Sequence, residues 1–277
     1  MESRSVRHPA VAGRFYPGKP ETLVRDLDRY LGSDAAESAE KIENALGCVV
    51  PHAGYMYSGH VAGAVYRRLP QRNSYIILGP NHTGRGAPLA TVSSGSWMTP
   101  LGNVPIDPEL AKGVKHACHL VMDDEAAHAN EHSLEVQLPF LQKVAAGFSF
   151  VPIAIGVGGF ASLEALGRGL AQVARSQVEP LLVVASSDMN HYESDSITRI
   201  KDRKAIDKIL DLDPKGLYDV VRNEDISMCG YGPAIAMLTF AREMGATKAE
   251  LIQYATSADV SGDRSSVVGY AGIVVSK

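Results

Sequence analysis

The stretch SYIILGPNHTG, residues 74–84, places an apolar run directly before a turn of small and polar residues that contains His82. A short run of consecutive apolar residues is typical of a strand that is buried on both faces. The glycine, proline and asparagine that follow are typical of a turn. We therefore predict a buried strand over 74–79 with an imidazole at its carboxyl end.

Strands of this kind alternate with amphipathic segments along the whole chain. Strands are predicted at 45–50, 148–156, 180–188, 250–256 and 265–276, and helices at 19–32, 60–68, 107–117, 130–147, 162–175, 201–211, 214–222 and 232–244. Apolar strands separated by helices indicate a sheet that helices cover on both sides. We find no internal repeat and no linker. The prediction is one α/β domain over residues 1–277, with a mixed, largely parallel sheet covered by helices on both faces.

Composition narrows the classes of partner. The chain has 277 residues, 45% of them hydrophobic, which is enough for a large core. A formal charge of -4 with scattered Lys and Arg residues offers no basic surface, so we expect no nucleic acid. No apolar stretch approaches the roughly 20 residues that span a bilayer, and the N-terminus carries charges where a signal peptide is apolar. We expect a cytoplasmic protein with no membrane attachment.

Histidine follows three separate predicted strands. His52 comes after the strand at 45–50, His82 after the strand at 74–79, and Asp188 with His191 after the strand at 180–188. The ligand site of an open α/β sheet lies beyond the carboxyl ends of its strands. A single histidine there is most often a hydrogen-bonded loop residue, and Asp188 is as well suited to capping a turn. Three of them favour a functional site, provided that the strands are neighbours.

The remaining histidines lack such a setting, and we interpret them as surface or packing residues: His8, His60, His116, His119 and His128. The three cysteines form an odd number without Cys-x-x-Cys spacing, so a disulfide scaffold is not expected. Cys229 stands out because it precedes the turn GYGP and an apolar helix, where the helix N-terminus favours a thiolate. A metal ligand, a reactive thiol and a buried spectator all remain open.

The segment NEHSLEVQLPF, at the start of the helix predicted at 130–147, contains Glu131 and His132. Its order is not the His-Glu-x-x-His of zinc proteases. Glu131 suits the first turn of a helix because of the helix dipole. Two interpretations remain open: these residues cap the helix, or they orient a ligand and line a pocket beside a metal.

The motifs together resemble the Memo family. The resemblance rests on RHPAVAGRFYPG, VPHAGYMYSG, GPNHTG, NEHSLEVQLPFL, SSDMNHY, CGYGP and SVVGYAGIVV, which occur in that order over essentially the whole chain. In bacteria and archaea this family is the B component of the AmmeMemoRadiSam system. It is similar in fold to the catalytic subunit of the LigB-type extradiol dioxygenases, which use non-haem Fe(II). The resemblance therefore implies a LigB-type fold.

The resemblance also implies roles for single residues. It places His52 and His82 as metal ligands, and Cys229 at the third ligand position, where the dioxygenases have a glutamate. His191 corresponds to their acid or base, and Asp188 lines the same pocket. One metal ion is implied, Fe(II) first, with copper or zinc as alternatives because a thiolate is a softer ligand than a carboxylate.

Two functions of different classes follow from these residues. In the first, the metal site supports an oxidation of an unknown small molecule, with His191 moving protons and Asp188 fixing its tautomer by a hydrogen bond. In the second, the pocket holds a peptide or a metal without turnover. Partner proteins of the AmmeMemoRadiSam system are possible in either case. A base beside the metal favours the enzyme, whereas the missing carboxylate ligand favours the binding module.

Overall fold

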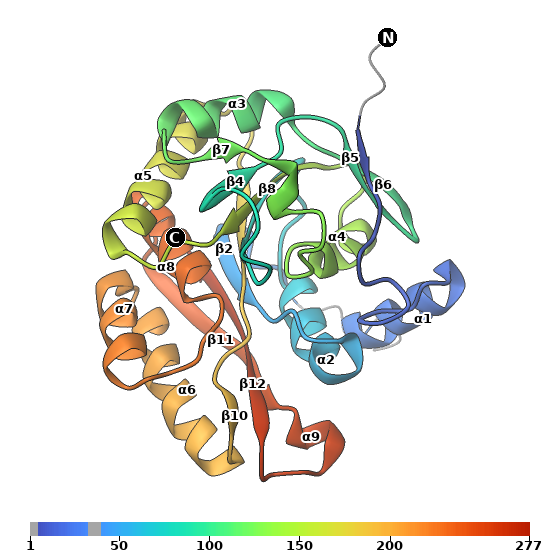
Figure 1. Ribbon diagram of the computed structural model, residues 1–277, viewed down its shortest axis with the longest axis vertical. Coiled ribbons are helices and arrows are strands. Elements are labelled where there is room, and N and C mark those ends of the chain that lie inside the picture. Colours follow the sequence, from blue (N-terminus) through green and yellow to red (C-terminus); the bar gives the residue numbers. More distant parts are fainter. Residues whose placement is uncertain (1–4, 33–39) are drawn as a thin grey trace.

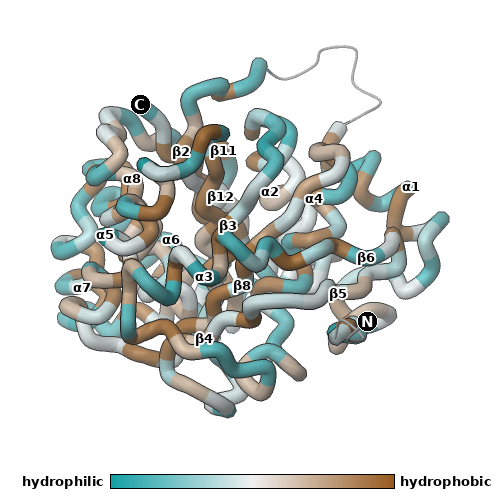
Figure 2. Tube along the Cα trace, turned by 90° about the horizontal axis from the view of Figure 1, so that it is seen from above, coloured by the Kyte–Doolittle hydropathy of each residue, from teal (hydrophilic) through white to brown (hydrophobic). Residues whose placement is uncertain are grey.

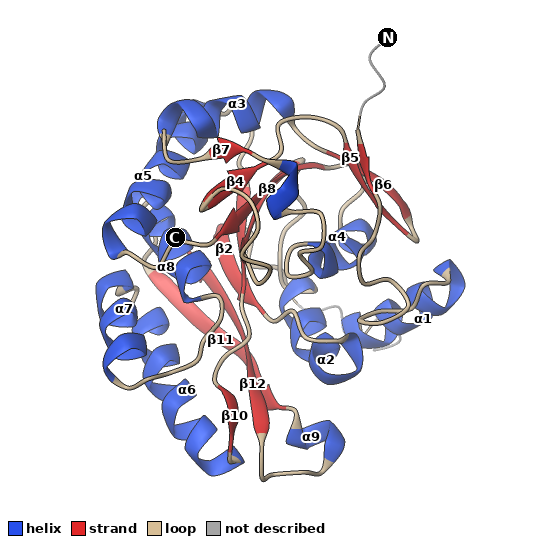
Figure 3. Cartoon of the chain, viewed as in Figure 1, coloured by secondary structure: helices blue, strands red, loops and turns tan. Residues whose placement is uncertain are grey.

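The computed structural model describes residues 5–32 and 40–277. Figure 1 shows strands in the middle of the molecule with helices on two sides of them, and Figure 3 shows the same layers by element type. Among the described residues the main sheet has nine strands. They are β2 (Ala45–Val50), β3 (Ser74–Pro80), β4 (Leu89–Thr91), β7 (Met122–Asp123), β8 (Ser149–Ile155), β9 (Leu182–Ser186), β10 (His191–Glu193), β11 (Lys248–Thr256) and β12 (Val267–Ser276).

The strand order is β10-β12-β2-β9-β3-β8-β4-β7, with β11 paired to β12 outside this path. The four central strands β2, β9, β3 and β8 run parallel to one another. Strand β12 is antiparallel to its neighbours, and β4 is antiparallel to β8. The predicted mixed α/β sheet is confirmed, with its parallel pairing concentrated at the centre.

Helices cover both faces of this sheet. On one side lie α1 (Pro20–Leu31), α2 (Tyr55–Tyr66) and α4 (Leu138–Val144), and on the other lie α3 (Pro108–Ala117), α5 (Phe160–Ser176), α6 (Asp195–Leu210), α7 (Pro214–Asn223) and α8 (Tyr231–Glu243). Successive strand residues alternate between the two cores: in β3, Ile76 and Leu78 face one and Tyr75 and Ile77 the other. Figure 2 shows the hydrophobic segments concentrated along the central strands.

A second, smaller sheet was not foreseen from the sequence. It has the order β1-β5-β6 and consists of β1 (Val6–Arg7), β5 (Ser96–Thr99) and β6 (Gly102–Pro105). Short elements complete the described chain: η1 (Glu125–Ala127), η2 (Glu135–Gln137) and α9 (Ala258–Ser261). Strands of two to four residues carry too little hydrophobic periodicity to be recognised in a sequence.

The helix predicted over 130–147 is wrong in its first part. The chain forms turns up to Leu134, then the 3₁₀ turn η2, and only then the seven-residue helix α4. Pro139 stands in the first turn of α4. A proline there lacks the N–H that a longer helix would need and clashes with the preceding turn, so the α-helix begins beside it.

Within residues 5–32 and 40–277, no helix combines the length and the apolar character that crossing a bilayer requires.

Candidate metal centre

Two of the predicted site residues, His52 and His82, meet because of the order of the central strands. Strand β9 lies between β2 and β3, and all three are parallel, so their carboxyl ends share one edge. His52 follows β2, and His82 follows β3. Their ring centroids are 5.2 Å apart, with the rings nearly perpendicular at 83°. The condition that the strands be neighbours is therefore met.

His132 is the third member of the group. Its ring stacks on His82 with centroids 4.6 Å apart and lies 5.4 Å from the ring of His52. One ring nitrogen from each of His52, His82 and His132 lies within 4.8 Å of the others, a grouping that can hold a metal ion. The turn before η2, rather than a strand end, presents His132, and the sequence had suggested for it only a capping or supporting role.

The hydrogen bonds of His52 fix its tautomer. Its Nδ1 lies 2.9 Å from Ser186 Oγ. That hydroxyl donates its own proton to the Ser133 carbonyl, 2.6 Å away, and accepts from Gln137 Nε2. Ser186 Oγ can therefore only accept from His52, so Nδ1 carries the proton and Nε2 the free lone pair. Burial, together with His132 and the other histidines nearby, holds the pKa of His52 well below its usual value.

Glu131 orients His82 in the same way. His82 Nδ1 donates to Glu131 Oε1 at 2.9 Å, and the backbone N–H of His82 donates to Oε2 at 2.6 Å. Ser133 N–H adds a third hydrogen bond. Although burial opposes ionisation, the hydrogen bonds that Glu131 accepts from His82 and Ser133 lower its pKa to about 2. With Nδ1 bound to Glu131, His82 offers Nε2 to a metal, as in carboxylate–histidine–metal arrangements.

Glu131 also contacts the third histidine. Its Oε1 lies 3.5 Å from His132 Nδ1. Burial lowers the pKa of His132 to about 4, so that its ring is neutral near pH 7. Because residues 130–134 are not helical, Glu131 and His132 do not cap a helix here. The position of Glu131 is the one that the ligand-orienting interpretation requires.

Cys229 lies against His52. Its Sγ is 3.2 Å from His52 Nε2 and 3.7 Å from the carbonyl oxygen of Asp188. Because His52 Nε2 has only a lone pair, the thiol is the donor of this contact. Burial and the Asp188 carboxylate raise the pKa of Cys229, which opposes the thiolate expected from the helix N-terminus. The role of Cys229 as a ligand stays a prediction.

Asp188 and His191 do not pair as the sequence suggested. Asp188 Oδ1 accepts from the backbone N–H groups of His52, at 2.8 Å, and Ala53, at 3.3 Å. Burial raises the pKa of Asp188. His191 instead donates from Nδ1 to the carbonyl oxygen of Ser227, 2.9 Å away, and its backbone N–H donates to Ser227 Oγ. Ser227 therefore fixes this tautomer, and no pattern in the sequence marks it.

Five of these side chains, those of His82, His132, Asp188, His191 and Cys229, line one cavity of about 600 Å³, whereas the buried His52 is not among its lining residues. Aromatic side chains stand on its wall together with the histidines: it is lined by Phe15, Ala53, Gly54, His82, His132, Asp188, His191, Tyr192, Ser227, Cys229, Val268 and Tyr270. With Nδ1 bound to Ser227, the ring of His191 has Nε2 left for a molecule in this cavity. The cavity is large enough for a small organic molecule.

A buried ion pair supports the turn that carries Glu131 and His132. Arg7 donates from Nε to the His128 carbonyl at 2.8 Å, from Nη2 to the Glu131 carbonyl at 2.7 Å and from Nη1 to Glu135 at 2.7 Å. Glu135 is fully buried and also accepts from two backbone N–H groups and a tyrosine hydroxyl of residues 10–16. Both charged residues stand in motifs noted in the sequence, Arg7 in RHPAVAGRFYPG and Glu135 in NEHSLEVQLPFL, but nothing in the sequence shows that these two segments pack together.

The fold and this centre define an open-sheet α/β protein with a histidine-rich candidate metal site at the strand ends. The family model described as Memo-like protein matches residues 7–274, so the chain belongs to the Memo family. A MEMO1 family protein of Methanopyrus kandleri is 44% identical over 277 residues, covering 97% of this chain and 98% of the relative. One of Methanosarcina mazei is 45% identical over 272 residues, covering 98% and 99%.

A solved structure shares the fold. The crystal structure of an uncharacterized protein from Escherichia coli K12 matches with a TM-score of 0.59, covering 83% of this chain and 99% of that one. Its sequence is 12% identical, so the likeness concerns the fold alone.

Proposed function

We propose that this protein holds one redox-active metal ion at His52, His82 and His132 and oxidises a small molecule in the adjoining cavity. The observation that carries the proposal is the convergence of three ring nitrogens within 4.8 Å. At two of these rings a hydrogen bond to Nδ1 leaves the lone pair on Nε2. Such preset lone pairs are what a metal centre requires. We place the protein in the cytoplasm, in keeping with its composition.

The donor set fits a first-row metal. Imidazole nitrogens suit iron, copper and zinc alike. Ligands that bind one ion at about 2.1 Å lie at most about 4.2 Å apart, so the three nitrogens need only a small closure. Fe(II) is our first choice, with copper and zinc as alternatives. Cys229, 3.2 Å from His52 Nε2, is placed to join as a fourth ligand or to replace His132.

The proposed reaction uses the metal and the residues for different tasks. A bound redox-active ion would pass the electrons that the small molecule gives up to dissolved O2, which is the oxidant. His191 takes up or gives a proton at Nε2, since its Nδ1–H is held by Ser227. Asp188 holds the backbone N–H groups of residues 52 and 53 and so keeps His52 in place.

Metal binding and turnover can be tested separately. The tag-free protein is titrated anaerobically with Fe(II), Cu(II) and Zn(II) by calorimetry. His132→Ala is expected to lower metal affinity at least 100-fold, while the exposed His119→Ala serves as the matched histidine control. A His132→Ala protein with unchanged affinity would remove the three-histidine centre. Oxygen uptake of the loaded protein with catechols and other phenols then tests for an oxidation.

A binding module without turnover remains the second candidate. The observation that favours it is Tyr192, a residue that lines the cavity, is 78% exposed and is therefore available to an incoming peptide. Its partner would be a peptide or a protein of the AmmeMemoRadiSam system. Under this function Tyr192→Ala weakens partner capture, whereas no loaded form consumes oxygen with any substrate tested.

A further inference from the structure

A tyrosine in the wall of the cavity beside the metal centre has a hydroxyl group without a partner. Tyr270 belongs to β12 and lines this cavity together with Val268, which lies two positions earlier on the same face of the strand. Its side chain is 2% exposed, and no residue in the described part of the chain forms a hydrogen bond with its hydroxyl. Buried hydroxyl groups of proteins nearly always have a partner, so this one is left for a molecule in the cavity.

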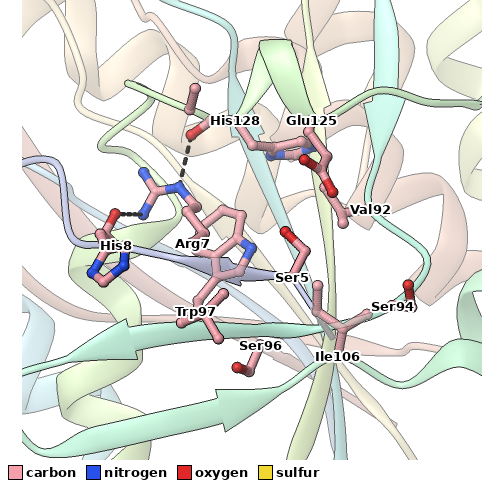
Figure 4. A pocket seen from close by; sticks show the side chains of 12 residues that line it. Ser5, Arg7, His8, Val92, Ser94, Ser96, Trp97, Ile106, Glu125 and His128 are labelled. Carbon is pink, nitrogen blue, oxygen red and sulfur yellow. Dashed lines mark hydrogen bonds between the residues drawn. The ribbon is translucent and has the colours of Figure 1, made fainter. Parts of the chain in front are cut away.

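The hydroxyl oxygen of Tyr270 is open to the cavity. His128 Nδ1 shows the opposite case: it is also unpaired, but it is sealed inside the protein beside a smaller cavity of about 280 Å³, where the ring packs on Trp97 with centroids 5.5 Å apart (Figure 4). A ligand cannot reach such an atom. Tyr270 Oη differs because it keeps accessible surface at the cavity of about 600 Å³.

Packing holds the ring of Tyr270 in place. The ring belongs to a small buried cluster with Val61 of α2 and Ala255 of β11. Ala255 is also the residue that faces Tyr270 across the β11–β12 pair. A tyrosine ring enclosed between a helix and a neighbouring strand has little freedom to change rotamer. The hydroxyl is therefore presented to the cavity at a fixed position.

The hydroxyl is suited to act as a donor. Burial, together with the Asp188 carboxylate, raises the pKa of Tyr270, so the hydroxyl keeps its proton at neutral pH. The same cavity wall includes Gly54, directly before α2, and this helix has neither a capping side chain nor an acidic residue in its first turn. A helix N-terminus favours negatively charged or electron-rich groups. Both features of the wall thus favour an oxygen acceptor on the bound molecule.

We propose that the substrate of this cavity carries a carbonyl-type oxygen on a planar ring, and that this oxygen accepts a hydrogen bond from Tyr270 Oη. The inference rests on the proposed function in one respect, namely that this cavity is the substrate site. The aromatic rings of Phe15 and Tyr192 on the same wall suit a planar ring. His191, whose Nδ1 is bound to Ser227, has Nε2 left for a second polar group of the substrate. Tyr270 is thus a substrate-binding residue that selects for the oxygen.

Three probes of the same shape separate acceptor from donor chemistry. Benzoate and benzamide present a carbonyl-type oxygen with and without a negative charge, whereas benzamidine has only N–H donors. Saturation-transfer NMR measures Kd, on the order of millimolar for such small molecules, with tag-free protein that is metal-free or loaded with redox-inactive Zn(II). Tyr270→Phe should weaken the binding of benzoate and benzamide about three- to tenfold, the effect of one hydrogen bond, and leave benzamidine binding unchanged. A loss confined to benzoate identifies a carboxylate, and one confined to benzamide a neutral carbonyl; either supports the hydrogen bond. Tyr218→Phe, in α7 and outside the cavity, is the matched control and should bind all three probes as the natural chain does.

Stability separates a binding role of the hydroxyl from a structural one. Tyr270→Phe removes a hydroxyl that no other described residue uses, so its midpoint of urea unfolding at pH 7 should equal or exceed that of the natural chain. Tyr254→Phe in the adjacent strand β11 should unfold at lower urea, because the Tyr254 hydroxyl donates to Asp202 at 2.7 Å. Tyr270→Phe should also bind Fe(II) as the natural chain does, because Tyr270 is not one of the proposed ligands.

Three results would overturn the proposal. The first is a natural chain that binds neither benzoate nor benzamide. The second is a folded Tyr270→Phe protein that binds both as tightly as the natural chain, or that loses affinity for benzamidine to the same extent. The third is a clear fall in the unfolding midpoint of Tyr270→Phe, which would give the hydroxyl a structural role. None of these depends on metal titration: a chain that binds no metal, but whose metal-free form shows the effect of Tyr270→Phe, would lose the proposed metal centre and keep this binding site.

Discussion

Replacing Arg7 by lysine should weaken the metal centre without touching a metal ligand. Lysine keeps the positive charge near Glu135 but is a compact ammonium that cannot copy the guanidinium fork. The two hydrogen bonds at 2.8 Å and 2.7 Å to the carbonyls of residues 128 and 131 would be lost. Those carbonyls belong to the turn that presents Glu131 and His132.

The magnitude follows from the burial of these groups. A hydrogen bond from a charged donor contributes about 1.5 to 3 kcal/mol, so the loss of two lowers the free energy of unfolding by roughly 3 to 6 kcal/mol. Arg7→Met should cost more than Arg7→Lys, because it loses the same two hydrogen bonds and also leaves Glu135 as an unpaired buried charge. The double variant Arg7→Met with Glu135→Gln should recover part of this loss.

Urea unfolding and metal titration measure the two effects independently. We expect Arg7→Lys to lower metal affinity about tenfold at a temperature where the protein is still folded. The control is Arg168→Lys in the exposed pair with Glu164, which should change stability by less than about 1 kcal/mol and leave metal affinity unaltered. If Arg7→Lys binds metal normally, the turn does not depend on Arg7, and the reasoning fails.

Three further outcomes are expected. Burial raises the pKa of Asp202 to about 7, so its contribution to stability is present below about pH 4 and is lost as the pH rises through 7. Urea unfolding at pH 8 should therefore give Asp202→Asn a free energy of unfolding up to about 4 kcal/mol above that of the natural chain, and no such gain at pH 4. Because its pKa is raised, the Cys229 thiol must release one proton if it binds the metal as a thiolate, and metal affinity should then rise about tenfold per pH unit between pH 7.5 and 9. Calorimetry that finds the same metal affinity across this pH range would assign the metal to the histidines alone. His191→Ala should keep metal affinity within a few-fold while slowing any metal-dependent oxidation by roughly 10² to 10⁴, and outright loss of the metal would contradict its role in proton transfer.

The sequence predicted those parts of the centre that depend on strand ends. Apolar runs mark β2, β3 and β9 directly, and the histidines after them lie where parallel strands end. What it could not supply is the insertion of β9 between β2 and β3, since that order is set by long-range pairing. The apolar runs therefore identified His52, His82 and His191 as candidates, but they did not show that the strands before these histidines are neighbours.

His132 escaped prediction as a central residue for a local reason. Its segment has helical spacing of apolar residues, and that pattern outweighed Pro139, which marks the true start of α4. Once the segment is a turn, His132 faces His82 instead of lying on a helix surface. Ser227 and Arg7 differ from it because each acts through hydrogen bonds to residues far away in the sequence, which leave no periodic trace.

The hydrogen bonds of the centre also explain why a cation suits it. His52 and His82 each give their Nδ1 proton to an acceptor held by another element, Ser186 in β9 and Glu131 in the turn, and so present unprotonated nitrogens on the opposite side of the ring. Around these lone pairs the structure provides one thiol donor, that of Cys229, at 3.2 Å from His52. Buried acceptors that face one another without enough donors are unfavourable, because each has lost its hydrogen bond to water. A divalent cation satisfies several of them at once, and the burial that lowers the pKa of His52 and His132 excludes protons as the competing solution near pH 7.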